Sequence, residues 1–569
     1  MKNFFWSILL GLTLISCARV GSPVGGDKDT IPPVFLGSNI DSPRINVNKN
    51  LKELRLNFNE YVLLKDVQKN LIISPPIKTM KRILPSNLAN KYVLLQWEDE
   101  LLENTTYNFN FGNSIVDNNE QVPLPYFNFA FSTGDKLDEN YLSGEIKSAV
   151  ARSSEKEQNI VVGLYKKSDS LDFKTKPFYI TKADNDGYFE LNYLGKGDYK
   201  LIAFEDLNSN SIYDAGTEDI AYVKDNIVID NSISGKNLRL FPSVKTPKYK
   251  EMKPMVGGID MIFEGNPKTV EVATKNPKFQ NFKVTHRAYS DTARIWLDVK
   301  NLDPKTNESV KFGYATEVKK DSASLFYKPE AKSDMTLSMK DNKVVPFGAF
   351  KISSNYHIDK IDPTNWVLKS DSINTVKFTA EISKTNPFEI LVNADFEEGK
   401  KYQLTVAKQS ISSFYQTVKN PYRFDFTRDK IENYSNLEIN IQNKPNSKFW
   451  IELLDVNFKV VYSKYTDEST VKFSFIKPQY YLVRMLVDAN NNELWDGVDL
   501  EKQIDAEPLY MLNKVLNPRP LWDLVESWDI SDPKSLEIPK NIPKNAPTPA
   551  ANNNDGVVRG DKAAVERIR

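Results

Sequence analysis

The sequence predicts an all-β fold in which several antiparallel β-sandwiches follow one another along the chain. Apolar and polar residues alternate over 54–59, 107–111 and 127–131, as they do in strands that bury one face. Clusters of Asn, Gly, Pro and Asp separate these strands at short intervals, and long stretches with helical spacing are scarce. Hydrophobic residues form 40% of the 569-residue chain, enough for packed cores, and the length suggests about four domains of ~150 residues.

The composition narrows the classes of function. The 75 basic and 75 acidic residues leave no net charge, which removes the usual electrostatic reason to expect a nucleic-acid partner. The only two histidines, His286 and His357, sit in patterns typical of exposed strand residues. Because histidine is the commonest general base and metal ligand, its scarcity argues against hydrolytic or zinc chemistry. We therefore expect no enzyme, with a carboxylate-based enzyme in the middle region as the third hypothesis.

The amino-terminal residues resemble the signal peptide of a bacterial lipoprotein. Lys2 provides a positive charge, and residues 4–14 form an apolar run that is too short for a bilayer span, which needs ~20 residues. The stretch 14–17, Leu-Ile-Ser-Cys, is similar to a lipobox. The resemblance implies a signal peptide at 1–16 that is removed.

The same resemblance implies that lipid is attached to Cys17. This is the only cysteine, so no disulfide can form within the chain. Several acyl chains, each contributing ~0.8 kcal/mol per buried methylene, hold a protein firmly to a membrane. Residues 17–30 are polar and rich in glycine, which predicts a flexible tether behind the lipid. We expect an outer-membrane, lipid-anchored protein on the periplasmic or cell-surface face; an ordinary secretory peptide with an incidental cysteine is the alternative.

Residues 31–135 form the first predicted folded domain. Its short motifs, in chain order, lie at 31–33, 54–62, 71–76, 102–107 and 131–134. This series resembles the bacterial Ig-like domain first recognised in S-layer proteins, which is common near the amino terminus of Bacteroidetes lipoproteins. The resemblance implies an antiparallel meander that displays or spaces other modules and carries no catalytic residues.

A second sandwich is predicted at 141–243. Strand patterns at 142–146, 161–165 and 197–204 flank Asp184–Phe189, where an Asp-Gly pair predicts the tight turn of a β-hairpin. The region resembles the transthyretin-like, or carboxypeptidase-regulatory-like, β-sandwich, a family module that is not itself catalytic.

An internal repeat links this second sandwich to the carboxy-terminal part of the chain. Residues 199–214 and 481–496 both end an apolar strand with the pattern D-x-N-x-N-x-x-x-D, and Tyr107 and Tyr402 follow similar turns. The chain is therefore predicted to contain two pairs of an Ig-like and a transthyretin-like domain. The predicted limits are 250–327 for a β module of unknown type, 328–428 for a possible second Ig-like domain and 434–528 for a second transthyretin-like sandwich.

The repeated loops are candidate calcium sites. Oxygen ligands at alternate positions, followed by an acid, can surround Ca²⁺. The candidate ligands are Asp206, Asn208, Asn210 and Asp214 in the first loop, and Asp488, Asn490, Asn492, Asp496 and Asp499 in the second. Ser211 and Glu493 occupy the position where such loops usually have glycine, and the few carboxylates predict low affinity. The alternative is that Asp and Asn cap tight turns by accepting bonds from nearby backbone amides.

The remaining features concern partners. Six tryptophans could line a sugar-binding platform, although aromatic residues in strands are usually core or rim packing: Trp97, Trp366, Trp450, Trp495, Trp522 and Trp528.

Residues 532–569 have little apolar content and predict a disordered tail. The leading hypothesis is a non-catalytic envelope lipoprotein that acts as a scaffold or protein-interaction module. The alternative is a surface glycan-binding lipoprotein in nutrient uptake.

Overall fold

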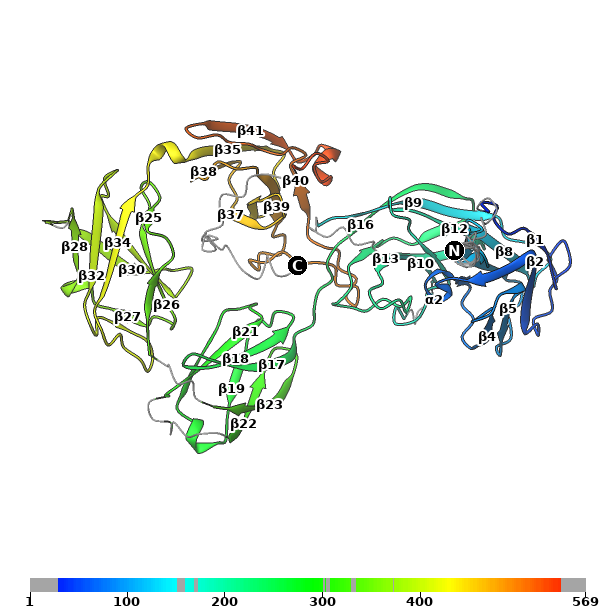
Figure 1. Cartoon of the computed structure of the whole chain (residues 1–569), viewed down its shortest axis with the longest axis horizontal. Helices are drawn as coiled ribbons and strands as arrows, with labels where there is room; N and C mark the ends of the chain where they lie inside the picture. The colour runs from blue at the N-terminus through cyan, green and yellow to red at the C-terminus, as the bar shows by residue number, and fades with distance from the viewer. Residues whose placement is uncertain are drawn as a thin grey trace, which may run out of the picture.

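The computed structural model describes residues 29–150, 159–167, 172–299, 302, 308–328, 334–371 and 373–543. The predicted signal peptide, the lipid site at Cys17, the tether up to residue 28 and the tail beyond 543 lie outside the described residues. The described chain is almost entirely β, and its sheets fall into five consecutive groups, which we call modules 1 to 5 (Figure 1). The predicted fold class, all-β with tandem antiparallel sandwiches, is confirmed. The exact domain limits stay predictions.

Module 1 is a sandwich of two antiparallel sheets that share an aromatic core. One sheet contains, in spatial order, β1 (Phe35–Ser38), β2 (Glu53–Leu64), β5 (Asn90–Trp97) and β4 (Met80–Leu84), with β7 (Ile115–Asp117) also on β2. The other contains β3 (Ile72–Ser74), β6 (Thr106–Gly112) and β8 (Phe127–Ser132); the short helix α2 (Val67–Asn70) precedes β3. Alternate residues of β6 and β8, including Phe109, Phe111 and Phe131, are fully buried between the sheets. The alternation in the sequence therefore marks the buried face correctly.

Module 2 combines a three-stranded and a five-stranded sheet. The first has the order β12 (Tyr188–Leu194), β9 (Asn140–Ser148) and β16 (Ile233–Leu240), with β16 parallel to β9. The second has the order β11 (Tyr179–Lys182), β10 (Ile160–Lys166), β13 (Gly197–Glu205) and β14 (Ile220–Tyr222), with β15 (Ile227–Ile229) also on β13.

Modules 3 and 4 are sandwiches of the same general kind. One sheet of module 3 has the order β17 (Lys248–Met255), β18 (Gly258–Glu264), β21 (Thr292–Leu297), β20 (Phe282–His286). The other sheet has the order β19 (Glu271–Ala273), β22 (Glu308–Ala315), β23 (Lys320–Tyr327), and the 3-10 turn η1 lies at Pro277–Phe279. Module 4 has the sheet β24 (Leu337–Met339), β26 (Phe350–Ser354), β31 (Glu389–Ala394), β30 (Phe378–Ile382) and the sheet β25 (Lys343–Val344), β34 (Tyr422–Arg428), β32 (Lys401–Val406), β28 (Val367–Ser370), β29 (Asn374–Thr375). A small pair, β27 (Lys360–Ile361) and β33 (Ile411–Ser412), and η2 (Pro363–Asn365) complete module 4.

Module 5 ends the described chain. One of its sheets has the order β38 (Thr470–Ile476), β35 (Ser435–Gln442), β41 (Asp523–Asp529). The other has the order β37 (Val460–Thr466), β36 (Phe449–Leu454), β39 (Leu482–Val487), β40 (Leu509–Met511). The 3-10 turn η3 (Ile431–Asn433) precedes it and η4 (Pro533–Leu536) follows it. The predicted tail thus begins with a packed segment, because Trp528 donates a bond to Ser535 (3.0 Å) and Ile542 packs against module 5.

Strand order repeats along the chain. Modules 2 and 5 share the same order in both sheets, including one parallel edge strand, β16 on β9 and β41 on β35. The sheet β1-β2-β5-β4 of module 1 has the order of β24-β26-β31-β30 in module 4. Tyrosine contacts repeat as well, since Tyr107 and Tyr402 each accept a backbone N–H from five residues upstream, at 2.8 and 2.7 Å.

The turn at Asp184 differs from its prediction. Asp184 accepts bonds from the amides of Asp186 and Tyr188, and Gly187 has a φ of 87°, so the tight turn itself is present. However, β11 and β12 on either side of it belong to different sheets. The turn is therefore a corner between the two layers of module 2 and the hairpin prediction was wrong, because each flanking strand finds a longer partner elsewhere.

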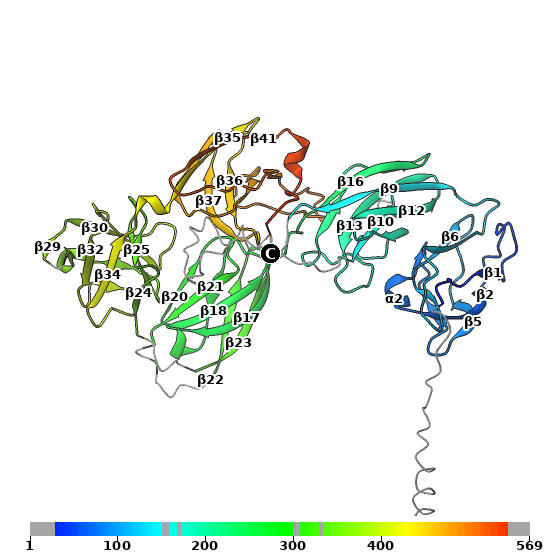
Figure 2. The same ribbon diagram turned by 45° about the horizontal axis from the view of Figure 1, so that its top comes forward.

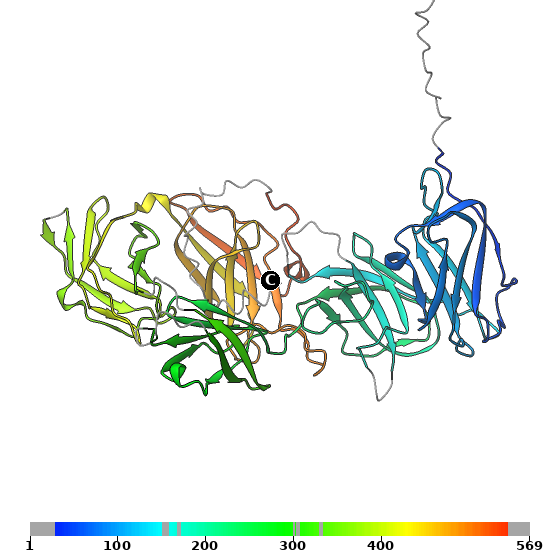
Figure 3. The ribbon, with the colours of Figure 1, turned by 60° about the horizontal axis from the view of Figure 1, so that its bottom comes forward.

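The modules follow a path that returns on itself. Module 1 lies at one end of the long axis and module 4 at the other (Figures 2 and 3). Module 5, in orange, lies between module 4 and module 2, so the chain comes back to module 2 after passing through modules 3 and 4 (Figure 1). In the described part of the chain, no helix has the length and apolar character needed to cross a membrane.

Candidate functional site

The first repeated loop, residues 206–218, is held by side-chain oxygens that accept backbone N–H bonds. The Asp206 carboxylate accepts from the amides of Asn210 (3.1 Å) and Ser211 (3.0 Å), and Asn208 Oδ1 accepts from Asn210 (3.0 Å). The Asn208 amide group donates to Asp214 at 2.6 Å. Ser211 adopts a φ of 59°, so a serine occupies the left-handed conformation in which glycine is usual.

The second repeated loop, residues 488–507, has the same arrangement. Asp488 accepts from the amides of Asn492 and Glu493, both at 3.0 Å, and Glu493 has a φ of 61°. Asn490 and Asn492 donate to the Asp496 carboxylate at 2.8 and 2.7 Å. The structure therefore brings the predicted residues of each loop together, and their oxygens cap the turn, as the alternative interpretation of the sequence expected.

A buried glutamate closes each loop, and the sequence pattern predicted neither. Glu218 accepts from the amides of Leu207 (3.0 Å) and Asp214 (2.9 Å). Glu507 accepts from the amides of Ala489 (2.8 Å), Asn490 (3.1 Å) and Asp496 (2.9 Å). Burial raises the pKa of Glu218, and it raises the pKa of Glu507 to about 7.

The spacing explains why the glutamates were missed. Glu218 comes 12 residues after Asp206, whereas Glu507 comes 19 residues after Asp488, so no common motif contains both. Asp499, which the sequence placed at the twelfth position of the second loop, bonds instead to the backbone and side chain of Lys502, at 3.1 and 2.8 Å. Within the described ranges, no group of three His, Cys, Asp or Glu side chains is arranged to hold a metal ion. Calcium binding stays a prediction.

Both loops lie at the contact between modules 2 and 5. The segment 241–244, which we call the exit segment, leaves module 2 between them. Ser243 accepts a bond from the Gly216 amide and donates one to the Glu218 carbonyl, at 3.0 and 2.8 Å. On its other side the exit segment pairs with Val498 of the second loop. One short segment therefore contacts both candidate sites.

An aromatic side chain covers each loop from inside. Tyr213 of the first loop packs edge-to-face on Phe204 at 5.9 Å between ring centroids, and Trp495 of the second loop is fully buried and donates to the Glu507 carbonyl at 3.0 Å. Trp495 also lies 6.3 Å from Phe241 of the exit segment. The loops thus form part of the packing between modules.

The histidines are more buried than predicted. His286 lies in strand β20 as expected, but it is half-buried and bonds to the Ser290 carbonyl at 3.1 Å. His357 lies between strands and stacks on Phe414 at 4.9 Å between ring centroids. Burial lowers the pKa of both imidazoles, which favours their neutral forms. The predicted strand position is confirmed for His286 and wrong for His357. The predicted exposure was wrong for both, because His286 bonds to a neighbouring turn and His357 stacks on a ring.

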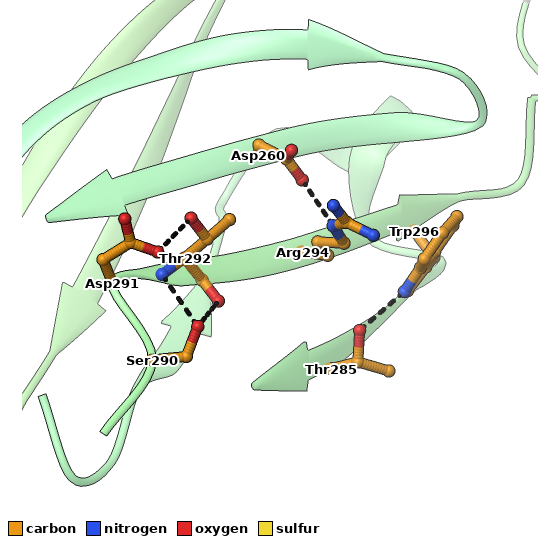
Figure 4. Close-up of polar contacts among 7 residues, drawn as sticks. All are labelled: Asp260, Thr285, Ser290, Asp291, Thr292, Arg294 and Trp296. Carbon is orange, nitrogen blue, oxygen red and sulfur yellow. Dashed lines mark hydrogen bonds and ion pairs between the residues drawn. The ribbon is translucent and has the colours of Figure 1, made fainter. Parts of the chain in front are cut away.

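Acidic residues in the middle region take part in structural contacts. In module 3, Asp260 on β18 accepts a bond from Arg294 on β21 at 3.1 Å (Figure 4). Asp291 accepts from the Thr292 hydroxyl at 2.7 Å in the same region. Trp296, two residues further along β21, extends toward the neighbouring strand β20 and donates to the Thr285 hydroxyl at 2.8 Å. These carboxylates are therefore engaged with neighbouring donors.

The tryptophans proposed for a sugar platform are mostly core residues. Trp522 is 49% exposed, and the other five candidates are at most 5% exposed: Trp97, Trp366, Trp450, Trp495 and Trp528. A row of these rings on the surface is therefore not available for stacking on a sugar.

A comparison with known protein families identifies the fold of module 1. Residues 29–133 match the family model described as a bacterial Ig-like domain, and module 1 is such a domain. A search of curated proteins found no match.

Solved structures give only distant likenesses. The surface layer protein SbsC, domains 1–6, is 9% identical with a TM-score of 0.16, over 86% of this chain and 68% of that one. BcpA, the major pilin subunit of Bacillus cereus, is 11% identical with a TM-score of 0.13, over 69% and 99%. The Bacillus anthracis TIE protein is 10% identical with a TM-score of 0.12, over 89% and 75%. These scores are too low to support a functional argument.

Proposed function

We propose that this chain is a non-catalytic lipoprotein of the bacterial cell envelope that acts as a structural scaffold or protein-interaction module. In this proposal lipid on Cys17 anchors it to the outer membrane, residues 17–30 are the tether, and modules 1 to 5 hold binding surfaces at a fixed distance from the anchor. The lipobox-like stretch supports the anchor, and the Ig-like first module supports a display or spacing role.

The observation that carries the proposal is that three pairs of consecutive modules, 1 and 2, 3 and 4, and 4 and 5, are joined by specific contacts. Between modules 1 and 2, the Ser74 hydroxyl donates to the Ile180 carbonyl at 3.2 Å and accepts from the Ile180 amide at 2.8 Å. The Lys182 ammonium of module 2 donates to the Lys69 carbonyl of module 1 at 2.6 Å. Such a joint fixes the angle between two sandwiches, which a scaffold requires.

The later joints are aromatic. Trp296 of module 3 packs on Tyr356 of module 4 at 5.6 Å, and a side chain at Gly257 would lie 2.2 Å from that tyrosine ring. Phe347 of module 4 packs on Phe475 of module 5 at 5.4 Å. Close packing of rings resists sliding more than a polar linker does. A spacer that holds binding surfaces at a fixed distance requires joints of this kind.

Crosslinking in whole cells tests the proposal. The chain would be tagged near Arg569, crosslinked, purified and analysed by mass spectrometry, with Cys17→Ala as the matched control for the anchor. We expect stable envelope protein partners with the native chain and their loss with the control, together with incorporation of labelled palmitate only into the native chain. Recovery of a transporter with glycan-degrading enzymes would instead support glycan uptake. Equal palmitate labelling of both chains would overturn the anchor.

A further inference from the structure

We propose that the contact between modules 2 and 5 is a clasp, which closes modules 2 to 5 into a ring and opens as one unit while each sandwich keeps its core. This inference goes beyond the proposed function and does not depend on the lipid anchor. The clasp consists of the exit segment, 241–244, and two residues of the second loop, Val498 and Leu500.

Backbone pairing forms the centre of the clasp. The Val244 amide donates to the Val498 carbonyl at 2.9 Å, and the Val498 amide donates to the Pro242 carbonyl at 3.0 Å. These two bonds join the segment that leaves module 2 to a loop that begins more than 200 residues later. The pairing is specific, because a shift by one residue would break both bonds.

Apolar side chains surround this pairing. Val498 and Leu500 are 3% and 5% exposed and pack with residues on the outer face of module 2, among them Ile202 and Phe204. Phe241 packs against this cluster and also against Trp450 and other residues on the outer face of module 5. Each module therefore inserts apolar residues into the surface of the other.

The clasp lies outside both sandwich cores. Among the described residues, the core between the sheets of module 2 is built only from residues 142–240, and the core of module 5 only from residues 437–530. The first and second loops also cover part of each outer face with their own Tyr213 and Trp495. Opening the clasp therefore removes no residue from either core.

The ring follows from the order of the joints. Modules 3 and 4 occupy the chain between the exit segment and module 5, and they connect to each other and to module 5 through the aromatic joints. The contact of module 5 with module 2 returns the chain to its starting point (Figure 1). When the clasp opens, the ring becomes a row of modules in series, and module 5 can move away from module 2.

Gly497 gives a means to open the clasp selectively. A Cβ atom at this position would lie 1.9 Å from the Pro242 carbonyl oxygen, a distance that no real contact allows. The φ of Gly497 is not in the left-handed region, so alanine is compatible with the backbone of its own loop. Gly313 is the matched control, because a Cβ there would meet its nearest atom at an ordinary 3.7 Å.

Distance measurement between two spin labels tests the clasp. In the full chain with Cys17→Ala, labels would be attached at Lys174→Cys and Glu501→Cys, an exposed ion pair across the contact with 3.9 Å between its charged atoms. We expect a single short distance, which Gly313→Ala preserves and Gly497→Ala replaces with a broad, long distribution. Circular dichroism of both glycine variants should match that of the parent, because the sandwiches remain folded.

Two results would overturn the proposal. One is a short distance that persists in both Gly497→Ala and a second variant, Leu500→Asp, which places a charge in the apolar part of the clasp. The other is loss of the β signal together with the short distance in both variants, because this would mean that modules 2 and 5 form one cooperative core. Opening in either variant with retained β structure supports the clasp.

Discussion

Modules 2 and 5 have the same strand order but differ in what faces the outer side of equivalent strands. In module 2, Gly163 pairs with Ile202 across β10 and β13. In module 5 the equivalent positions on β36 and β39 are Glu452 and Arg484, a buried ion pair with a 2.5 Å contact. Pro177 occupies the space that a side chain at Gly163 would need, because its Cγ lies 2.3 Å from the point that a Cβ would occupy. The same strand order therefore accommodates an apolar pair at one position of module 2 and a charged pair at the equivalent position of module 5, because the surrounding side chains differ.

A second difference lies beside the loops. By strand register, Lys182 in module 2 corresponds to Tyr465 in module 5, since they pair with Val161 and Trp450 at equivalent positions. Tyr465 donates to the Asp488 carboxylate at 2.5 Å, whereas Lys182 extends to module 1. Lys182 also interacts with the charge of Asp206, so the position faces the first aspartate of the loop in both copies, but only in module 2 does it also join two modules.

The largest expected effect comes from breaking the buried ion pair. Arg484→Met leaves the Glu452 carboxylate, which is 0% exposed, without its cation, and we expect module 5 to lose ~3–5 kcal/mol of unfolding free energy. Differential scanning calorimetry of the full chain should show a lower transition for module 5. The control is Ile202→Met at the equivalent position of module 2, which should cost less than ~1.5 kcal/mol. A similar loss in both variants would contradict the comparison.

The next effect concerns the first aspartate of each loop. Asp206→Ala and Asp488→Ala each remove a carboxylate that accepts bonds from two backbone amides, but Asp488→Ala also leaves the Tyr465 hydroxyl without its acceptor. We expect losses of ~1–2 kcal/mol for the first variant and ~2–3 kcal/mol for the second. Hydrogen exchange of the Ser211 and Glu493 amides reports each loop directly. Equal losses would show that the tyrosine bond contributes nothing.

A pH effect should report on the buried glutamate of the second loop. Because burial raises the pKa of Glu507 from 4.5 to about 7, the folded state binds more protons than the unfolded state between these values. The contribution of Glu507 to the free energy of unfolding is therefore complete below pH 4.5 and is lost as the pH rises to 7. We expect this loss to be ~1–2 kcal/mol. The difference in stability between the native chain and Glu507→Gln, measured at several pH values, isolates this group. A difference that does not change from pH 4.5 to 7 would contradict the assignment.

The smallest expected effect is that of calcium. If both loops bind Ca²⁺ with low affinity, a concentration equal to the dissociation constant stabilises each by only ~0.4 kcal/mol. Millimolar calcium should then raise the melting temperature of the native chain slightly and leave the double variant Asp206→Ala/Asp488→Ala unchanged. Magnesium at the same concentration is the control for ionic strength. An equal shift in the double variant would assign the effect to other sites.

Much of the fold could be predicted because strand patterns are local. The alternation at 54–59 falls within β2 (Glu53–Leu64), and the aromatic alternations fall within β6 and β8. The D-x-N-x-N pattern predicted turns held by side-chain oxygens, since the residues that bond are within six positions of one another. Short-range hydrogen bonds leave a sequence pattern that can be recognised without a structure.

What could not be predicted depends on distant residues. Glu507 joins its loop through an insertion that has no counterpart near Glu218. Phe241 contacts Trp495, although modules 3 and 4 separate these two residues in the sequence. The sequence around Arg484 is an apolar strand in which one arginine would normally indicate an exposed position. Its burial follows from Glu452 on the neighbouring strand, which no local pattern records.

The clasp also determines how the chain would respond to a pulling force. Module 2 begins at Asn140, and Ile542 packs with Phe241 and Val150 in the same apolar cluster. Tension applied between Asn140 and Ile542 would therefore run mainly through module 2, the clasp and module 5, because this path is shorter than the one through modules 3 and 4. Rupture of the clasp would place modules 3 and 4 in series between modules 2 and 5. The molecule would then become longer before any sandwich unfolds.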